Sequence, residues 1–146
     1  MSEATFRVPM IVRNYELDAL GHVNQAEYHH YAEHARVELF RRAGVSLEGM
    51  VADGAAPVML ESRVVYRKEL RASQEFEVDC EAKFGTGKTF AMNSTIWLPD
   101  GTVSATIECT LGVMDLHRRK LITDPAGMFA AHSSDPESFG LPAAPR

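Results

Sequence analysis

Residues 24–44 read NQAEYHHYAEHARVELFRRAG and contain the only long helical pattern of the chain. Asn24 is a typical N-cap residue, and Glu27 three positions later completes a pattern similar to a capping box. Two arginines in the last turn and Gly44 after them are typical of a helix C-terminus. We therefore expect a helix from Asn24 to Ala43, about 30 Å long at the usual rise per residue.

One side of this helix is apolar and requires a second layer to cover it. The apolar side chains recur at helical spacing and are Tyr28, Tyr31, Ala32, Ala35 and Leu39. Five strand-like stretches can supply the covering layer, and they are residues 6–15, 56–68, 75–84, 89–98 and 102–116. Short turns join the last four stretches, so these strands are expected to be antiparallel neighbours. The sequence therefore predicts an α+β fold, with one long helix across a five-stranded antiparallel sheet.

The length of 146 residues fits one domain, which we expect to span residues 1–125. Residues 126–146 are rich in alanine, proline, serine and glycine. We expect this segment to be a loosely ordered C-terminal tail.

Composition excludes several classes of protein. A net charge of −5 argues against nucleic-acid binding, because neutralising phosphates requires a basic surface. The N-terminus does not resemble a signal peptide, and no apolar run is long enough to span a membrane. Cys80 and Cys109 lie in strand-like stretches, which favours buried free thiols. We expect a cytoplasmic protein.

Residues 30–34, HYAEH, match the H-x-x-E-H signature of one class of zinc peptidase. However, His30 and His34 fall on the side of the helix opposite the apolar stripe, where they are expected to face solvent. A catalytic zinc also requires a third protein ligand, and no later helix offers one at a suitable spacing. We therefore expect no metal site.

Residues 85–89, GTGKT, are similar to part of a phosphate-binding loop. The first glycine of that motif is replaced by Ala82, and a strand rather than a helix follows Thr89. A glycine-rich hairpin turn is the better interpretation.

The loop that leads into the helix, YELDALGHVNQAEY at residues 15–28, concentrates groups suited to acyl transfer. Asp18 is a carboxylate close to a helix N-terminus, whose free backbone N–H groups can hold an oxyanion. His22 and Asn24 add a titratable ring and an amide. The alternative is that Asp18 caps a turn, Asn24 caps the helix and His22 is a solvated loop residue. Composition alone favours that alternative.

Residues 12–36, VRNYELDALGHVNQAEYHHYAEHAR, strongly resemble the opening of hotdog-fold acyl-CoA thioesterases of the 4-hydroxybenzoyl-CoA thioesterase-like family. The positions in register with the family pattern are Arg13, Asp18, Gly21, His22, Val23, Asn24, Ala26, Tyr28, Tyr31, Glu33, Ala35 and Arg36. Weaker matches follow at residues 64–68, 87–90 and 112–125. The chain departs from the pattern at Glu16, Gln25 and Glu69, which leaves the acyl group open.

This resemblance implies a hotdog fold, in which a curved antiparallel sheet wraps one long central helix. It also implies hydrolysis of an acyl-CoA thioester, with Asp18 as the nucleophile or as the general base for water. The helix N-terminus, around His22, Val23 and Asn24, would polarise the thioester carbonyl through backbone N–H groups. A non-catalytic module that binds acyl-CoA remains the alternative.

The resemblance also implies partners and substrate contacts. Members of the family form homodimers or homotetramers, with active sites at the dimer interface. Tyr28 and Tyr31 would line the acyl pocket, and Arg63, Arg67 and Lys88 could meet the phosphates of CoA. No cofactor is expected, because CoA is part of the substrate.

Overall fold

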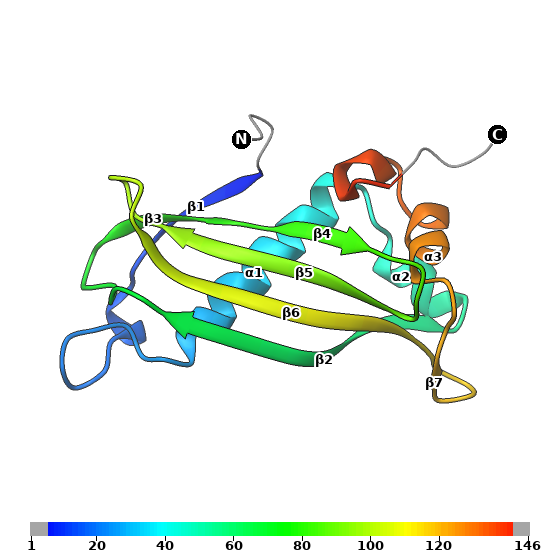
Figure 1. The fold of residues 1–146 in the computed structure, drawn as a ribbon, viewed down its shortest axis with the longest axis horizontal. Coiled ribbons are helices and arrows are strands. Elements are labelled where there is room, and N and C mark those ends of the chain that lie inside the picture. The colour runs from blue at the N-terminus through cyan, green and yellow to red at the C-terminus, as the bar shows by residue number, and fades with distance from the viewer. Residues whose placement is uncertain (1–5, 142–146) are drawn as a thin grey trace. The chain divides into compact units, whose positions relative to one another are not determined.

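The structure, a computed structural model, describes residues 6–141, which fall into two compact units (Figure 1). The first unit comprises the chain up to Val37 together with Arg63–Glu81 and Asn93–Glu108. The second unit comprises Glu38–Ser62, Ala82–Met92 and the chain from Cys109 onward. Several long elements pass from one unit into the other, and each unit is described below by itself.

The elements combine helices with a single antiparallel sheet, as the sequence predicts. The helices are α1 (Glu27–Arg42), α2 (Leu47–Ala52) and α3 (Pro125–Ala131), with short 3-10 helices η1 (Asn14–Glu16) and η2 (Pro136–Phe139). The strands are β1 (Arg7–Ile11), β2 (Ala55–Tyr66), β3 (Glu75–Asp79), β4 (Glu81–Phe84), β5 (Thr89–Trp97), β6 (Val103–Asp115) and β7 (Lys120–Leu121). The main strand order is β1-β3-β5-β6-β2, with β4 paired to β5 and β7 paired to β6. The predicted α+β class is confirmed, although the sheet has seven strands rather than the expected five, because residues 75–84 form two strands and β7 is added.

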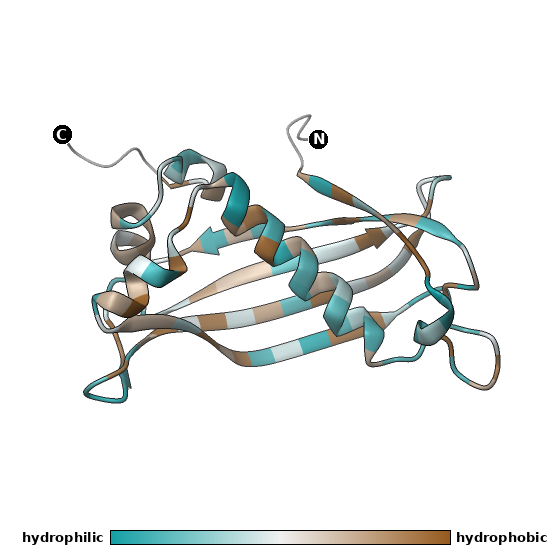
Figure 2. Ribbon diagram, turned by 180° about the vertical axis from the view of Figure 1, so that it is seen from behind, coloured by the Kyte–Doolittle hydropathy of each residue, from teal (hydrophilic) through white to brown (hydrophobic). Residues whose placement is uncertain are grey.

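The apolar stripe of α1 is buried, as predicted, while hydrophilic residues alternate with it along the helix (Figure 2). In the first unit, the ring centroid of Tyr31 lies 4.7 Å from that of Phe76 on β3. In the second unit, Phe40 at the end of α1 stacks on Phe129 of α3 at 5.8 Å. Within residues 6–141, no helix combines the length and the apolar character needed to cross a membrane.

The expected strand at residues 75–84 is divided into β3 and β4. The carboxylate of Asp79 accepts hydrogen bonds from the backbone N–H of Thr95, at 2.6 Å, and from the indole N–H of Trp97, at 2.9 Å. A side chain thus takes a backbone donor that would otherwise be available for ladder pairing, and the strand ends at Asp79.

The segment after residue 125 is folded rather than a loosely ordered tail, so this prediction is wrong for residues 126–141; residues 142–146 lie outside the described part. Asp124 caps α3 by accepting the N–H of Gly127 at 3.0 Å. Phe129 is fully buried and Phe139 is 3% exposed. Their rings contact each other and Phe40, which fixes the segment in the core of the second unit.

Replacing Phe129 with alanine removes the centre of this aromatic cluster and leaves a cavity. We expect Phe129→Ala to lower the free energy of unfolding by about 3–5 kcal/mol, measured by urea denaturation. Val51→Ala on α2 is the control, because Val51 is 52% exposed and its truncation should cost less than about 0.5 kcal/mol. An effect of Phe129→Ala as small as that of the control would show that the segment is not part of the core.

Candidate active site

The loop between η1 and α1 forms a small hairpin that presents Asp18. Leu17 and Val23 form an antiparallel bridge, and the N–H of Asp18 donates to the carbonyl of His22 at 2.7 Å. Gly21 closes the turn with φ at +78°, a conformation that other residues adopt only with strain. The hairpin is therefore short and held at its base by backbone hydrogen bonds.

The carboxylate of Asp18 is exposed and engaged through one oxygen only. Its Oδ1 accepts the N–H of Leu20 at 2.9 Å and the N–H of His22 at 3.2 Å. Within the described part of the chain, Oδ2 has no hydrogen-bond donor. Asp18 thus combines a fixed orientation with a free oxygen, which a base or nucleophile requires.

Glu16, two residues before Asp18, fixes this loop to the rest of the first unit through hydrogen bonds. Its side chain is buried, and its Oε1 accepts the N–H of Arg13 at 2.8 Å and the hydroxyl of Tyr31 at 2.9 Å. Its carbonyl accepts the N–H of Asn24 at 2.8 Å. Burial, together with the hydrogen bond to Glu16, raises the pKa of the Tyr31 hydroxyl, which therefore stays protonated and donates.

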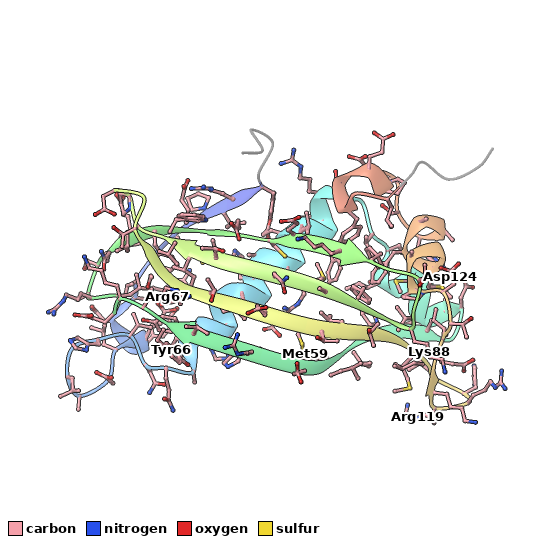
Figure 3. All side chains as sticks on the ribbon, in the orientation of Figure 1. Met59, Tyr66, Arg67, Lys88, Arg119 and Asp124 are labelled. Carbon is pink, nitrogen blue, oxygen red and sulfur yellow. The ribbon has the colours of Figure 1, made fainter. Side chains whose placement is uncertain are left out.

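Asp18 opens onto a pocket of about 320 Å³ in the first unit. The lining residues are Asp18, His22, Val23, Gln25, Tyr28, Tyr66, Arg67, Lys68 and Glu69. Five of the predicted site residues are thus brought together, and these are Asp18, His22, Val23, Tyr28 and Arg67. Tyr66 and Arg67 lie at the end of β2, as Figure 3 shows.

Tyr66 is a lining residue that the sequence analysis did not assign to the site. Its hydroxyl donates to the carbonyl of Gln25 at 3.1 Å, and its ring meets Tyr28 edge-on at 5.0 Å. The signal was present in VVYRK at residues 64–68, one of the weaker matches to the family pattern, in which Tyr66 directly precedes Arg67. Glu69 completes the wall, and hydrogen bonds from its own backbone amide and from Arg71 lower the pKa of its carboxyl.

The prediction that the amides of residues 22–24 form an oxyanion site disagrees with the structure. The N–H groups of His22, Val23 and Asn24 donate to Asp18 Oδ1, the Leu70 carbonyl and the Glu16 carbonyl, respectively. They are therefore not available to a substrate.

The backbone N–H of the next residue, Gln25, is unpaired in the part of the chain that the structure describes. Helix α1 begins at Glu27 rather than at Asn24, whose side chain accepts the N–H of Ala26 at 2.9 Å in the turn before the helix. The carbonyl of Asn24 accepts the N–H of Glu27. Between them, the N–H of Gln25 has no acceptor among residues 6–141. The N–H of Gln25 is thus a free donor on a residue that lines the pocket.

The other predicted residues do not line this pocket. Tyr31 borders a different cavity of the first unit, and Asn24 lines neither cavity. Arg63 forms an exposed ion pair with Glu108 at 3.0 Å. Lys88 belongs to the second unit, in the turn between β4 and β5 (Figure 3).

Among residues 6–141, the H-x-x-E-H histidines belong to no cluster of side chains able to hold a metal ion. His30 contacts Glu27 at 3.2 Å, and both His30 and His34 are exposed, as predicted, although they also border a cavity. Over residues 6–141, no group of three or more histidine, cysteine, aspartate or glutamate side chains could hold an ion.

Comparison with known proteins assigns a family to this arrangement. The model of a family described as the thioesterase-like superfamily matches residues 12–132. The long-chain acyl-CoA thioesterase FadM of Escherichia coli is 30% identical over 112 residues, which cover 76% of this chain and 84% of that protein. The acyl-acyl carrier protein thioesterase ATL3 of Arabidopsis thaliana is 34% identical over 71 residues, 49% of this chain but only 37% of ATL3.

A solved structure agrees with these sequence matches. YbaW, a probable thioesterase from Escherichia coli, superposes with a TM-score of 0.74 at 28% identity. The match covers 81% of this chain and 89% of YbaW. The helix-on-sheet arrangement is thus the fold of thioesterases of this superfamily.

Removing the Tyr31 hydroxyl tests whether its hydrogen bond to Glu16 holds the Asp18 loop in place. Tyr31→Phe leaves the buried Oε1 of Glu16 with one donor fewer, and we expect a loss of about 1–3 kcal/mol in the free energy of unfolding. Tyr15→Phe is the matched control, since Tyr15 is 76% exposed and its hydroxyl only accepts from Arg13. Urea denaturation of both variants measures the difference. Equal effects would contradict a role for the buried carboxylate in holding the loop.

Proposed function

Because the chain belongs to the thioesterase-like superfamily, a family of thioester hydrolases with the hotdog fold, we propose that it hydrolyses acyl-CoA thioesters at Asp18. One observation carries the proposal: the Asp18 carboxylate, with Oδ2 free, and Gln25, with its N–H free, line the same pocket. A base or nucleophile beside an oxyanion donor is the minimum that thioester hydrolysis requires.

In the proposed reaction the thioester carbonyl accepts a hydrogen bond from the Gln25 N–H. Asp18 removes a proton from water, the water oxygen bonds to the carbonyl carbon, and the carbon–sulfur bond breaks. The proton passes to the departing thiolate, so the products are a carboxylic acid and a thiol. If Asp18 attacks directly, water hydrolyses the resulting mixed anhydride to the same products. Either route relies on the Gln25 amide to hold the oxyanion.

The charged residues of the pocket suit a CoA thioester. Arg67 and Lys68 line it from the end of β2, and both side chains can meet phosphates. Tyr28 and Tyr66 offer apolar ring surface for the acyl group. The names of FadM and ATL3 specify different carriers of the acyl group, CoA and acyl carrier protein. Because two adjacent cationic side chains, Arg67 and Lys68, line the pocket, we propose CoA as the carrier.

Asp18→Asn is the central test of this proposal. Asparagine keeps the oxygen that accepts from Leu20 and His22, so the loop should stay folded while the base is lost. We expect kcat/KM to fall at least about a hundredfold, measured as thiol release from acyl-CoAs of graded length and from aromatic ones. Asp100→Asn, in the exposed β5–β6 turn, should retain nearly full activity.

Two outcomes would reject the proposal. Near-full activity of Asp18→Asn would remove Asp18 from the mechanism. Saturable binding of acyl-CoA to the wild-type protein, without thiol release across the whole panel, would instead favour the non-catalytic binding module.

We further propose that the protein forms a homodimer through β2. This strand ends the strand order of the sheet, so one of its edges is open to another strand. Met59 and Leu60 on it are 41% and 47% exposed, and Figure 3 labels Met59 on the strand. Exposed apolar side chains on an unpaired strand edge favour association with a second copy.

A charged substitution on this strand tests the interface. We expect the wild-type protein to migrate as a dimer or tetramer of its 16.2 kDa chain in size exclusion with light scattering, and Leu60→Glu to shift it toward monomer. Val51→Glu, at an exposed position of α2, should leave the oligomer unchanged. A monomeric wild-type protein, or an unchanged Leu60→Glu oligomer, would contradict association through β2.

A further inference from the structure

A second and larger cavity lies in the first unit and does not include Asp18. Its volume is about 830 Å³, within the usual range of small-molecule sites. The lining residues are Pro9, Met10, Ile11, Arg13, Glu16, His30, Tyr31, His34, Glu75, Phe76, Glu77 and Pro99. They come from β1, η1, α1 and β3, and from the turn after β5.

The buried carboxylate of Glu16 borders this cavity, and its Oε2 accepts no hydrogen bond from residues 6–141. Both hydrogen bonds to its side chain go to Oε1, from the N–H of Arg13 and from the hydroxyl of Tyr31. The nearest cation to Oε2 is the Arg13 guanidinium at 4.0 Å, too far for a hydrogen bond. Among residues 6–141, no side-chain nitrogen or oxygen sealed from solvent lacks a partner, so Oε2 must be accessible. The cavity that Glu16 lines provides that access.

Aromatic and apolar side chains surround this carboxylate. The rings of Tyr31 and Phe76 lie 4.7 Å apart between their centroids, and both residues are almost completely buried. Met10 and Ile11 add aliphatic surface from β1. Aromatic faces attract organic cations, and the aliphatic surface suits an alkyl or aryl body.

The charge of the lining is predominantly negative. Glu77 is paired with Arg7 at 3.4 Å, whereas Glu75 has no ion-pair partner among residues 6–141. Arg13 is the lining guanidinium, and it donates to the hydroxyl of Tyr15. The imidazoles of His30 and His34 complete the rim, and His30 is in contact with Glu27. Glu16 and Glu75 therefore remain as carboxylates able to accept from a ligand.

We propose that this cavity binds an amphipathic organic amine. The ammonium group donates to Oε2 of Glu16 and is attracted by Glu75, while the apolar body packs on Tyr31, Phe76 and Met10. The site is distinct from the Asp18 pocket, where Arg67 and Lys68 offset the charges of Asp18 and Glu69. The three lining carboxylates repel the phosphates of CoA and the free acid that hydrolysis would release.

Three ligands of equal chain length test the preference for a cation. Binding of n-octylamine, n-octanol and octanoate to the wild-type protein is measured by isothermal titration calorimetry at pH 8, where an alkylamine is protonated. We expect octylamine to bind at least about tenfold more tightly than either of the others, as a charge-assisted hydrogen bond contributes. Failure of octylamine to bind, or equal or tighter binding of octanol or octanoate, would overturn the proposal.

Variants locate the site and separate it from the proposed thioesterase site. Glu16→Gln should weaken octylamine binding about tenfold, and the exposed Glu75→Gln, which does not perturb the core, should weaken it about threefold. Glu61→Gln, exposed on β2, is the matched control and should have no effect. Asp18→Asn should also leave octylamine affinity unchanged, whatever its effect on thiol release. Loss of affinity in Asp18→Asn, or unchanged affinity in Glu75→Gln, would overturn the assignment to this cavity.

Discussion

The carboxylate of Glu16 holds together three parts of the first unit that are separate in sequence. It accepts hydrogen bonds from the amide of Arg13 after β1 and from the hydroxyl of Tyr31 on α1, and the backbone carbonyl of Glu16 accepts the amide of Asn24. A buried carboxylate is costly unless such bonds replace its hydration. Because the same residue holds both ends of the hairpin that carries Asp18, the position of the proposed reactive group depends on this one network.

Two cavities of the first unit are both lined in part by residues of α1, and the charges that line them differ. Tyr28 lines the pocket of Asp18 and Tyr31 lines the larger cavity, and their ring centroids are 6.1 Å apart. Arg67 and Lys68 balance the carboxylates of the first pocket, whereas carboxylates outnumber cations in the second. The two cavities thus differ in net lining charge within a single compact unit, and this difference is the basis of the different ligands proposed for them.

Local patterns predicted the fold class, the family and the cluster around Asp18, because helical period, turn residues and the motif at residues 12–36 are contiguous in the chain. The use of the backbone amides was not predictable in the same way. Val23 donates to Leu70, a partner 47 positions away that only the folded chain brings near. Phe129 and Phe139 were missed because they stand among small residues without a clear period, and tertiary packing alone makes them core residues.

The two oxygens of the Asp18 carboxylate are chemically alike but structurally distinct. Oδ1 is held by the amides of Leu20 and His22, so the group cannot rotate about its Cβ–Cγ bond without breaking both hydrogen bonds. A substrate or water that enters the pocket therefore always meets Oδ2, whose lone pairs keep a fixed orientation relative to the loop. The loop thus makes the two equivalent oxygens of a carboxylate inequivalent, with Oδ1 bound to the backbone and Oδ2 left for a substrate or water.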